Sequence, residues 1–270
     1  MSAPARAASW CAGLLAAALM PGAFAVTLTL TAETTYPAVM MNGARVTGHA
    51  AEKIHEIMRR AGIGYTMATM PWKRAYILAA TDNATCVFMT TRTPERDALF
   101  HWIGPISKSD WVLYGRADRR YDVTTVEQAR GLRVGSYYGD SRGEFLAALG
   151  HNVEFAQNDE SNPKKLMLDR IDLWVNSTRS SGPLLTKLGL SGKVVPILTF
   201  HQVKLYLACN RALPESVAAR MNAALRTMEA DGTYKAIEAA FEYLQDTGAA
   251  NQSERSSTSS SFQHPVFLKK

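Results

Sequence analysis

The first 90 residues alternate between strand patterns and helix patterns. Residues 26–31 alternate apolar and hydroxyl side chains, which is typical of a strand. Apolar residues at helical spacing follow between Gly48 and Gly62, then a strand pattern at 65–70, a short helix from Trp72 and a strand pattern at 86–90. Strands that alternate with helices predict an α/β fold, with a parallel sheet covered by helices.

A second set of strands and helices follows. Strand patterns lie at 111–116, 132–136, 152–155, 171–175 and 203–209, with helices after 140, at 164–169, from Pro214 and around Tyr234. Two α/β units in one chain predict two lobes with a cleft between them. Because open α/β sheets bind ligands at the carboxyl ends of their strands, we look for function in the loops at 33–36, 90–96 and 138–141.

The N-terminus has the pattern of a secretory signal peptide. Arg6 is followed by a short apolar stretch, a Pro-Gly break and Ala23-Phe24-Ala25, a small-x-small cleavage site. We therefore interpret residues 1–25 as a signal peptide and expect an exported, periplasmic protein. At the other end, residues 246–270 are rich in Ser, Asn and Gln without periodicity, which predicts a disordered tail.

Composition excludes little but disfavours nucleic acid as a partner. The chain of 270 residues has a formal net charge of +6. Its Lys and Arg residues are scattered, whereas a nucleic-acid-binding protein concentrates them on one helix or face. We expect no nucleic-acid partner and attribute most of the charge to solvated surface.

Two cysteines remain after the predicted leader, Cys86 and Cys209. In an exported protein they could form a disulfide. Both lie in apolar strand patterns, so two separate buried thiols are the alternative.

One segment points to a family. Residues 90–106 read Thr-Thr-Arg-Thr-Pro-Glu-Arg-Asp-Ala-Leu-Phe-His-Trp-Ile-Gly-Pro-Ile. This segment resembles the signature of bacterial extracellular solute-binding protein family 3, the amino-acid-type receptors of ABC transporters. Further matching motifs occur in the expected order: Pro71-Trp72-Lys73-Arg74-Ala75, Val134-Gly135 with Gly139-Asp140-Ser141, and Asp231-Gly232-Thr233-Tyr234.

The resemblance implies a type II periplasmic-binding-protein fold with two lobes joined by two hinge strands. Lobe 1 would hold residues 26–110 and 203–245, and lobe 2 residues 111–202. The strand with Cys209 would lie beside the strand with Cys86, where a disulfide is sterically conceivable. The partners implied are a small-molecule ligand and an inner-membrane ABC permease, and we expect a monomer.

The resemblance also assigns roles in lobe 1. Arg96 matches the arginine that grips the ligand carboxylate, for which a guanidinium fork is well suited. The alternative for Arg96 is a surface ion pair with Glu95 or Asp97. Thr91 would add a donor beside it, and Arg92 is either a second anion contact or solvated surface.

Three further side chains of lobe 1 match ligand contacts in relatives. Tyr36 and Trp72 would sandwich the ligand, since aromatic faces supply a large contact area at low entropy cost. The alternative for both is core packing. Glu33 lies where relatives often have an acidic ligand contact, and its alternative is a surface carboxylate.

Lobe 2 would complete the site. Asp140 and Ser141 lie in a turn before a helix, which offers either free N–H groups to a ligand or only a helix cap. Asn176 occupies a position where amino-acid receptors carry an acid that holds the ligand ammonium. An amide cannot supply that charge, so the sequence leaves open a carboxylate, an amide or another small polar solute.

We therefore expect a protein that binds a small polar, carboxylate-bearing ligand by hinge closure, and not an enzyme. His55-Glu56 lacks the second zinc-binding histidine, and no nucleophile elbow or phosphate-binding loop occurs. We expect no cofactor and no metal. Two alternatives are a dehydratase-like exported enzyme, with Glu33 as its acid or base, and a ligand-sensing accessory subunit.

Overall fold

A computed structural model describes residues 27–242. The predicted signal peptide and C-terminal tail lie outside the described residues. The strands are β1 (Thr27–Ala32), β2 (Met40–Asn42), β3 (Arg45–Thr47), β4 (Gly64–Thr69), β5 (Thr85–Thr91), β6 (Phe100–Arg116), β7 (Arg133–Tyr137), β8 (Asn152–Ala156), β9 (Leu173–Ser177) and β10 (Val194–Asn210). The helices are α1 (His49–Ala61), α2 (Trp72–Thr81), α3 (Pro94–Asp97), η1 (Val126–Ala129), α4 (Ser141–Ala148), α5 (Ser161–Met167), α6 (Thr178–Lys187) and α7 (Glu215–Ala230). Residues 233–242 are also helical.

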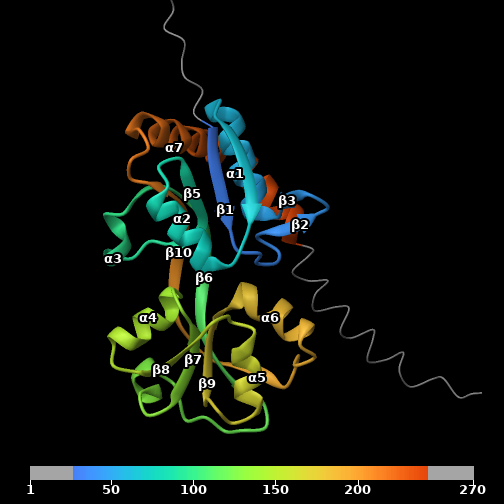
Figure 1. Ribbon diagram of the computed structural model, residues 1–270. Helices are drawn as coiled ribbons and strands as arrows, with labels where there is room; N and C mark the ends of the chain where they lie inside the picture. Colours follow the sequence, from blue (N-terminus) through green and yellow to red (C-terminus); the bar gives the residue numbers. More distant parts are fainter. Residues whose placement is uncertain (1–26, 243–270) are drawn as a thin grey trace, which may run out of the picture.

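The chain forms two α/β lobes that share one sheet, in the order β4-β1-β5-β10-β6-β9-β7-β8 (Figure 1). The strands β6 and β10, of 17 residues each, pair antiparallel along their length and pass from one lobe to the other. This arrangement confirms the predicted type II fold. We propose lobe boundaries near residues 110 and 203, because β6 pairs with β9 from Trp111 onward and β10 pairs with β5 from Leu205 onward.

Lobe 1 buries both faces of its sheet under helices. In β5, Cys86 and Phe88 pack with α1 and α7, whereas Val87 packs with α2, as the alternation of side chains along a strand requires. Helix α1 begins after Gly48, where a Cβ would lie 2.4 Å from the carbonyl oxygen of Ala38. A glycine is therefore needed where the loop after β1 meets α1.

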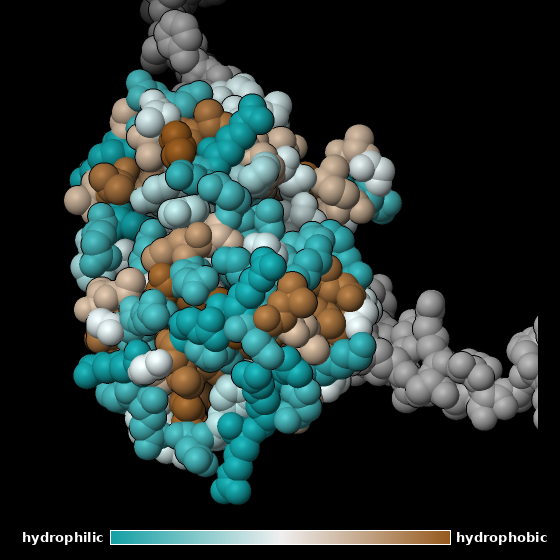
Figure 2. Space-filling view, turned by 60° about the horizontal axis from the view of Figure 1, so that its bottom comes forward, coloured by the Kyte–Doolittle hydropathy of each residue, from teal (hydrophilic) through white to brown (hydrophobic). Residues whose placement is uncertain are grey.

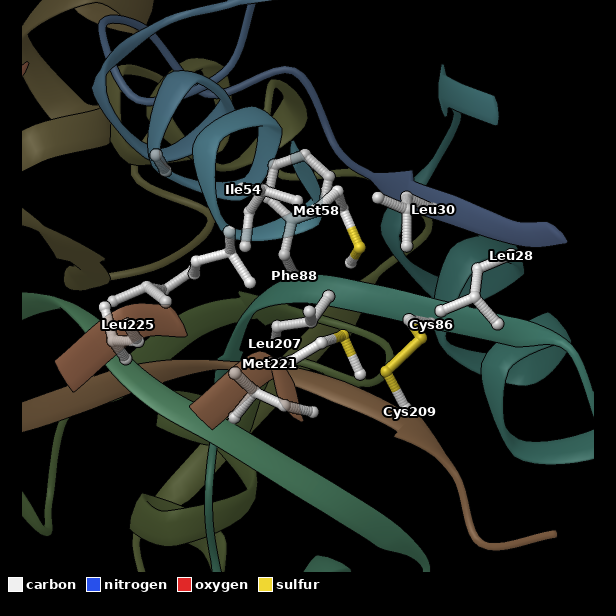
Figure 3. Packing of buried hydrophobic residues seen from close by; sticks show 14 of the residues in the cluster. Leu28, Leu30, Ile54, Met58, Cys86, Phe88, Leu207, Cys209, Met221 and Leu225 are labelled. Carbon is white, nitrogen blue, oxygen red and sulfur yellow. A yellow bond between two sulfur atoms is a disulfide. The ribbon is translucent and has the colours of Figure 1, made fainter. Parts of the chain in front are cut away.

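A disulfide lies at the centre of this core. Cys86 and Cys209 are register partners on β5 and β10 and are joined by a disulfide, so the open alternative of two free thiols does not hold. Figure 3 shows it among apolar side chains that include Leu28, Phe88 and Met221.

Lobe 2 repeats the layering on a smaller scale. Val112 and Trp174 pack with residues of α5 and α6 on one face, and Val134 and Val175 pack with Leu146 of α4 on the other. Helices α4 and α6 lie on the side of lobe 2 that faces lobe 1 (Figure 1).

Several elements differ from the sequence-based expectation. The hinge strands are much longer than the patterns at 111–116 and 203–209, and neither the hairpin β2–β3 nor α6 was predicted. Pro214 precedes α7 as its N-cap rather than being its first residue.

No helix within residues 27–242 is long and apolar enough to cross a membrane. On the face in Figure 2, hydrophobic residues form separate patches among hydrophilic ones. Leu168, at 64% exposure, is the most exposed of the large hydrophobic side chains in the described part.

Candidate functional site

A cavity of about 660 Å³ lies where the two lobes face each other. Its walls come from the loops that follow β1, β5, β7 and β8, and from α6, which directly follows β9. Strand-end loops thus converge on one cavity, as expected for an open α/β sheet.

The cavity brings together most of the predicted site residues. Those that line it are Glu33, Tyr36, Trp72, Thr91, Arg96, Asp140 and Ser141. Two predicted residues do not line it. Arg92 is largely exposed and pairs with Asp97 at 2.5 Å, and Asn176 is fully buried behind the cavity wall.

Arg96 reaches across the cleft. Its side chain is only 7% exposed, and its Nη2 atom donates to Glu144 Oε2 of lobe 2 at 2.7 Å and to the carbonyl oxygen of Gly139 at 3.0 Å. The ion pair therefore joins Arg96 to Glu144 and not to Glu95 or Asp97, the two partners considered from the sequence.

Other contacts also join the lobes. Trp72 donates its indole N–H to the carbonyl oxygen of Gly139 at 2.8 Å, and Tyr137 donates its hydroxyl to Glu33 Oε2 at 3.3 Å. Gly139 has φ 83°, which a residue with a side chain rarely adopts, so the turn that presents this carbonyl requires glycine. The described conformation is a closed one.

Arg142 is the centre of a buried network in lobe 2. Its Nε donates to Asp140 Oδ1 at 2.8 Å, and its Nη1 donates to Asn176 Oδ1. Asp140 also caps α4, accepting from the backbone N–H of Arg142. Asp140 thus acts as the helix cap considered from the sequence and also fixes a guanidinium in the cavity wall.

Asn176 needs both halves of its amide. Its Oδ1 accepts from Arg142 and from the hydroxyl of Ser180, while its Nδ2 donates to Asp159 Oδ2 at 3.1 Å. A carboxylate at this position could not donate to Asp159. Asn176 therefore positions two charged side chains that do line the cavity.

Asp159 places a carboxylate beside the amide of Asn176. It is half-buried and lines the cavity near Glu33. Because protein surrounds the cavity that these carboxylates face, burial raises the pKa of Asp159 to about 6. Burial, followed by the charge of Asp159, also raises the pKa of Glu33. Within residues 27–242, neither carboxylate forms an ion pair with a basic side chain.

The cavity residues that were missed from the sequence include Arg142, Asp159 and Arg179. Arg142 and Arg179 each follow a strand by a few residues and stand in the first turn of a helix, a position that could have drawn attention to them. Asp159 lies in a loop, and only the fold brings it against Asn176. Among the described residues, no group of three or more His, Cys, Asp or Glu side chains is placed to hold a metal ion.

The sequence profile of the bacterial extracellular solute-binding proteins, family 3, matches residues 28–242. The chain belongs to this family. No curated protein sequence matches the chain.

Solved structures share the fold at low identity. A histidine kinase sensor domain with similarity to periplasmic binding proteins has a TM-score of 0.72 and 16% identity, over 80% of this chain and 96% of that one. The arginine-, lysine-, histidine-binding protein ArtJ of Geobacillus stearothermophilus has a TM-score of 0.68 and 14% identity, over 80% and 95%. The GluR0 ligand-binding core of Nostoc punctiforme, in complex with L-glutamate, has a TM-score of 0.66 and 18% identity, over 80% and 99%.

Proposed function

We propose that this family member captures a small, amino-acid-like ligand, bearing a carboxylate and an amine, in the cavity between its lobes. The observation that carries the proposal is a cavity lined by a buried guanidinium and by two carboxylates that form no ion pair in the described part of the chain. Such a cavity suits a ligand that carries both charges.

Arg96 is the proposed carboxylate anchor. Its Nη2 atom makes both of its contacts across the cleft, and within residues 27–242 its Nε and Nη1 atoms have no hydrogen-bond partner. Two adjacent N–H groups match the two oxygens of a carboxylate. Thr91 also lines the cavity and would add its hydroxyl or its backbone N–H.

Glu33 and Asp159 are the proposed amine contacts. Their raised pKa values mean that each charge is poorly compensated in the ligand-free cavity. An ammonium group between them would stabilise both ionised forms. The amino acids that ArtJ and GluR0 bind agree with this ligand class.

Hinge closure is the proposed mechanism. The ligand first meets lobe 1 at Arg96, Thr91, Tyr36 and Trp72, and lobe 2 then adds Asp140 and Ser141. Bending would occur in β6 and β10, the two long strands that join the lobes. Ligand favours the closed form only through contacts it makes in that form and not in the open one.

Delivery to an inner-membrane ABC permease is the proposed consequence of closure, with the protein acting in the periplasm. Family membership supports both statements. The likeness to a histidine kinase sensor domain keeps a ligand-sensing accessory role as the second candidate. Loss of ligand uptake after deletion of the gene would identify the transport role, and loss of a transcriptional response with uptake intact would identify the sensing role.

A thermal-shift screen tests the binding function. The purified protein would be heated with amino acids, small carboxylates, amines and sugars. A ligand that binds only the folded state stabilises it by about 2.7 kcal/mol at a hundredfold excess over Kd. We expect hits among ligands with both a carboxylate and an amine. Hits confined to sugars or to simple amines would refute the proposed ligand class.

A further inference from the structure

Three basic side chains of the cavity wall each have a carboxylate partner. These pairs are Arg96–Glu144 at 2.7 Å, Arg142–Asp140 at 2.8 Å and Lys187–Glu160 at 2.8 Å. Arg179 also lines the cavity. Within residues 27–242, no carboxylate lies within ion-pairing distance of Arg179, so its charge lacks a counter-ion.

The contacts of Arg179 fix its position without compensating its charge. Its Nε donates to the carbonyl oxygen of Lys108 on β6 at 2.9 Å, and its Nη1 lies 3.1 Å from Nε2 of His49, the first residue of α1. Burial, followed by the charges of Arg179 and Lys53, lowers the pKa of His49 to about 3. His49 therefore stays neutral and accepts a hydrogen bond from the guanidinium.

Lys53 cannot act as a counter-ion for Arg179, because its own side chain is a buried cation. It pairs with Glu238 at 2.6 Å, and burial is the main cause that lowers its pKa to about 8, with Arg179 contributing in the same direction. The region around the start of α1 thus carries an excess of positive charge. An anion that entered the cavity beside Arg179 would offset this excess.

Arg179 and Arg96 serve different parts of the cavity. Arg96 contacts the turn before α4, and Arg179 extends from α6 to α1 and β6. Figure 1 places α4 and α6 on opposite sides of the part of lobe 2 that faces lobe 1. One ligand could satisfy both guanidinium groups only if it carried two separate anionic groups.

We propose that Arg179 binds a second carboxylate of the ligand, so that the protein selects dicarboxylic amino acids over their amides. This inference rests on the proposed function and names its ligand class more closely. A guanidinium without a counter-ion discriminates because the neutral amide of the analogue cannot offset its charge. Arg179 would then determine specificity and, through its contacts with His49 and Lys108, also hold the lobes closed.

Isothermal titration calorimetry on the whole purified protein tests the inference with two matched ligand pairs: L-glutamate with L-glutamine, and L-aspartate with L-asparagine. We expect the protein to bind one of the acids at least about tenfold more tightly than its amide. Arg179→Gln should remove most of that preference. Arg179→Lys, which keeps the charge, should retain part of it. Lys193→Gln, at an exposed lysine outside the cavity, is the control and should change nothing.

Each result bears on the inference. Equal affinity for the acids and the amides in the wild type would overturn it, as would a preference that survives in Arg179→Gln. Binding of neutral or basic amino acids alone would overturn it and leave the proposed function standing. If no amino acid or carboxylate bound, both would fail. In a folded Arg179→Gln protein, NMR titration of the His49 ring should give a higher pKa, which checks that the two side chains interact.

Discussion

Arg96 and Glu144 form an ion pair between the lobes, with 2.7 Å between Nη2 and Oε2. Arg96 is buried, whereas Glu144 is 51% exposed. Glu144 thus holds the proposed carboxylate anchor from the opposite side of the cleft. The pair links the binding residue to lobe closure, because opening the cleft must separate the two side chains.

Glu144→Gln should shift the ligand-free protein toward open forms. A half-exposed ion pair contributes only about 0.2–1 kcal/mol, so we expect the ratio of open to closed molecules to rise by a few-fold. Small-angle X-ray scattering should record a larger radius of gyration. Asp122→Asn removes a carboxylate that is 90% exposed and should leave the scattering unchanged. A more compact Glu144→Gln protein would show that the pair does not favour closure.

Affinity for an amine-bearing ligand should rise with pH. The pKa of Asp159 is raised to about 6, mainly by burial, so this carboxylate is mostly protonated at pH 5 and ionised at pH 7.5. If the ammonium group needs the ionised form, affinity should rise about tenfold over this range. Asp159→Asn should bind more weakly at pH 7.5 and lose most of this dependence. A deaminated analogue of the same ligand should lack the gain, and an equal gain for it would contradict the assignment.

The raised pKa of Asp159 has the opposite effect on the stability of the folded protein: stability falls as pH rises, whereas ligand affinity increases. Because the folded state holds the proton of Asp159 more tightly than the unfolded state, the contribution of this group to stability is greatest below its ordinary pKa of 3.8. That contribution is lost as pH rises toward about 6. A bound amine should reduce this loss.

Gly143→Ala should destabilise lobe 2. A Cβ at Gly143 would lie 2.4 Å from Ser136 Oγ and 2.8 Å from Phe155 Cε1, so α4 would be pushed away from β7 and β8. Overpacking of this kind costs about 1–3 kcal/mol, which urea unfolding would measure. Gly131→Ala is the control, since a Cβ there meets nothing within 4 Å. Equal stabilities of the two variants would refute the close packing of α4.

Reduction of the Cys86–Cys209 disulfide should lower the stability of lobe 1. The bond joins residues 123 positions apart and lies within the core between β5 and β10. Loss of such a cross-link typically costs about 2–5 kcal/mol. Urea unfolding with and without a reducing agent would measure the loss, and a Cys86→Ala, Cys209→Ala double variant should be weakened and insensitive to the agent. An unchanged wild-type midpoint under reducing conditions would contradict this role.

The sequence predicted the lobes because their elements have clear periodicity. Leu28 and Leu30 alternate with threonines in β1, and α1 ends at Gly62 in the left-handed conformation, as its pattern indicated. The lengths of the hinge strands were underestimated, because successive side chains in their middle parts do not alternate regularly between buried and exposed. Helix α6 was missed because Gly182 and Pro183 lie within it and are typical of turns.

The site was predicted only where side chains follow strands in familiar motifs. Arg96 and Trp72 could be found in this way. The roles of Asp159 and Arg179 could not be predicted, because they depend on contacts made in the folded protein: Asp159 with Asn176, and Arg179 with His49. The sequence also suggested that the amide at Asn176 leaves lobe 2 without the acid that holds a ligand ammonium, whereas the fold brings the carboxylate of Asp159 from another loop beside it.

Calorimetric titration of an amino acid into the wild type and Arg96→Ala is the most direct test of the central claim, that the cleft binds a carboxylate-bearing ligand through Arg96. Loss of a charge-assisted contact typically costs about 1.5–3 kcal/mol, so we predict an affinity lower by about tenfold or more in a variant that remains folded. Unchanged affinity in a folded Arg96→Ala protein would contradict the account.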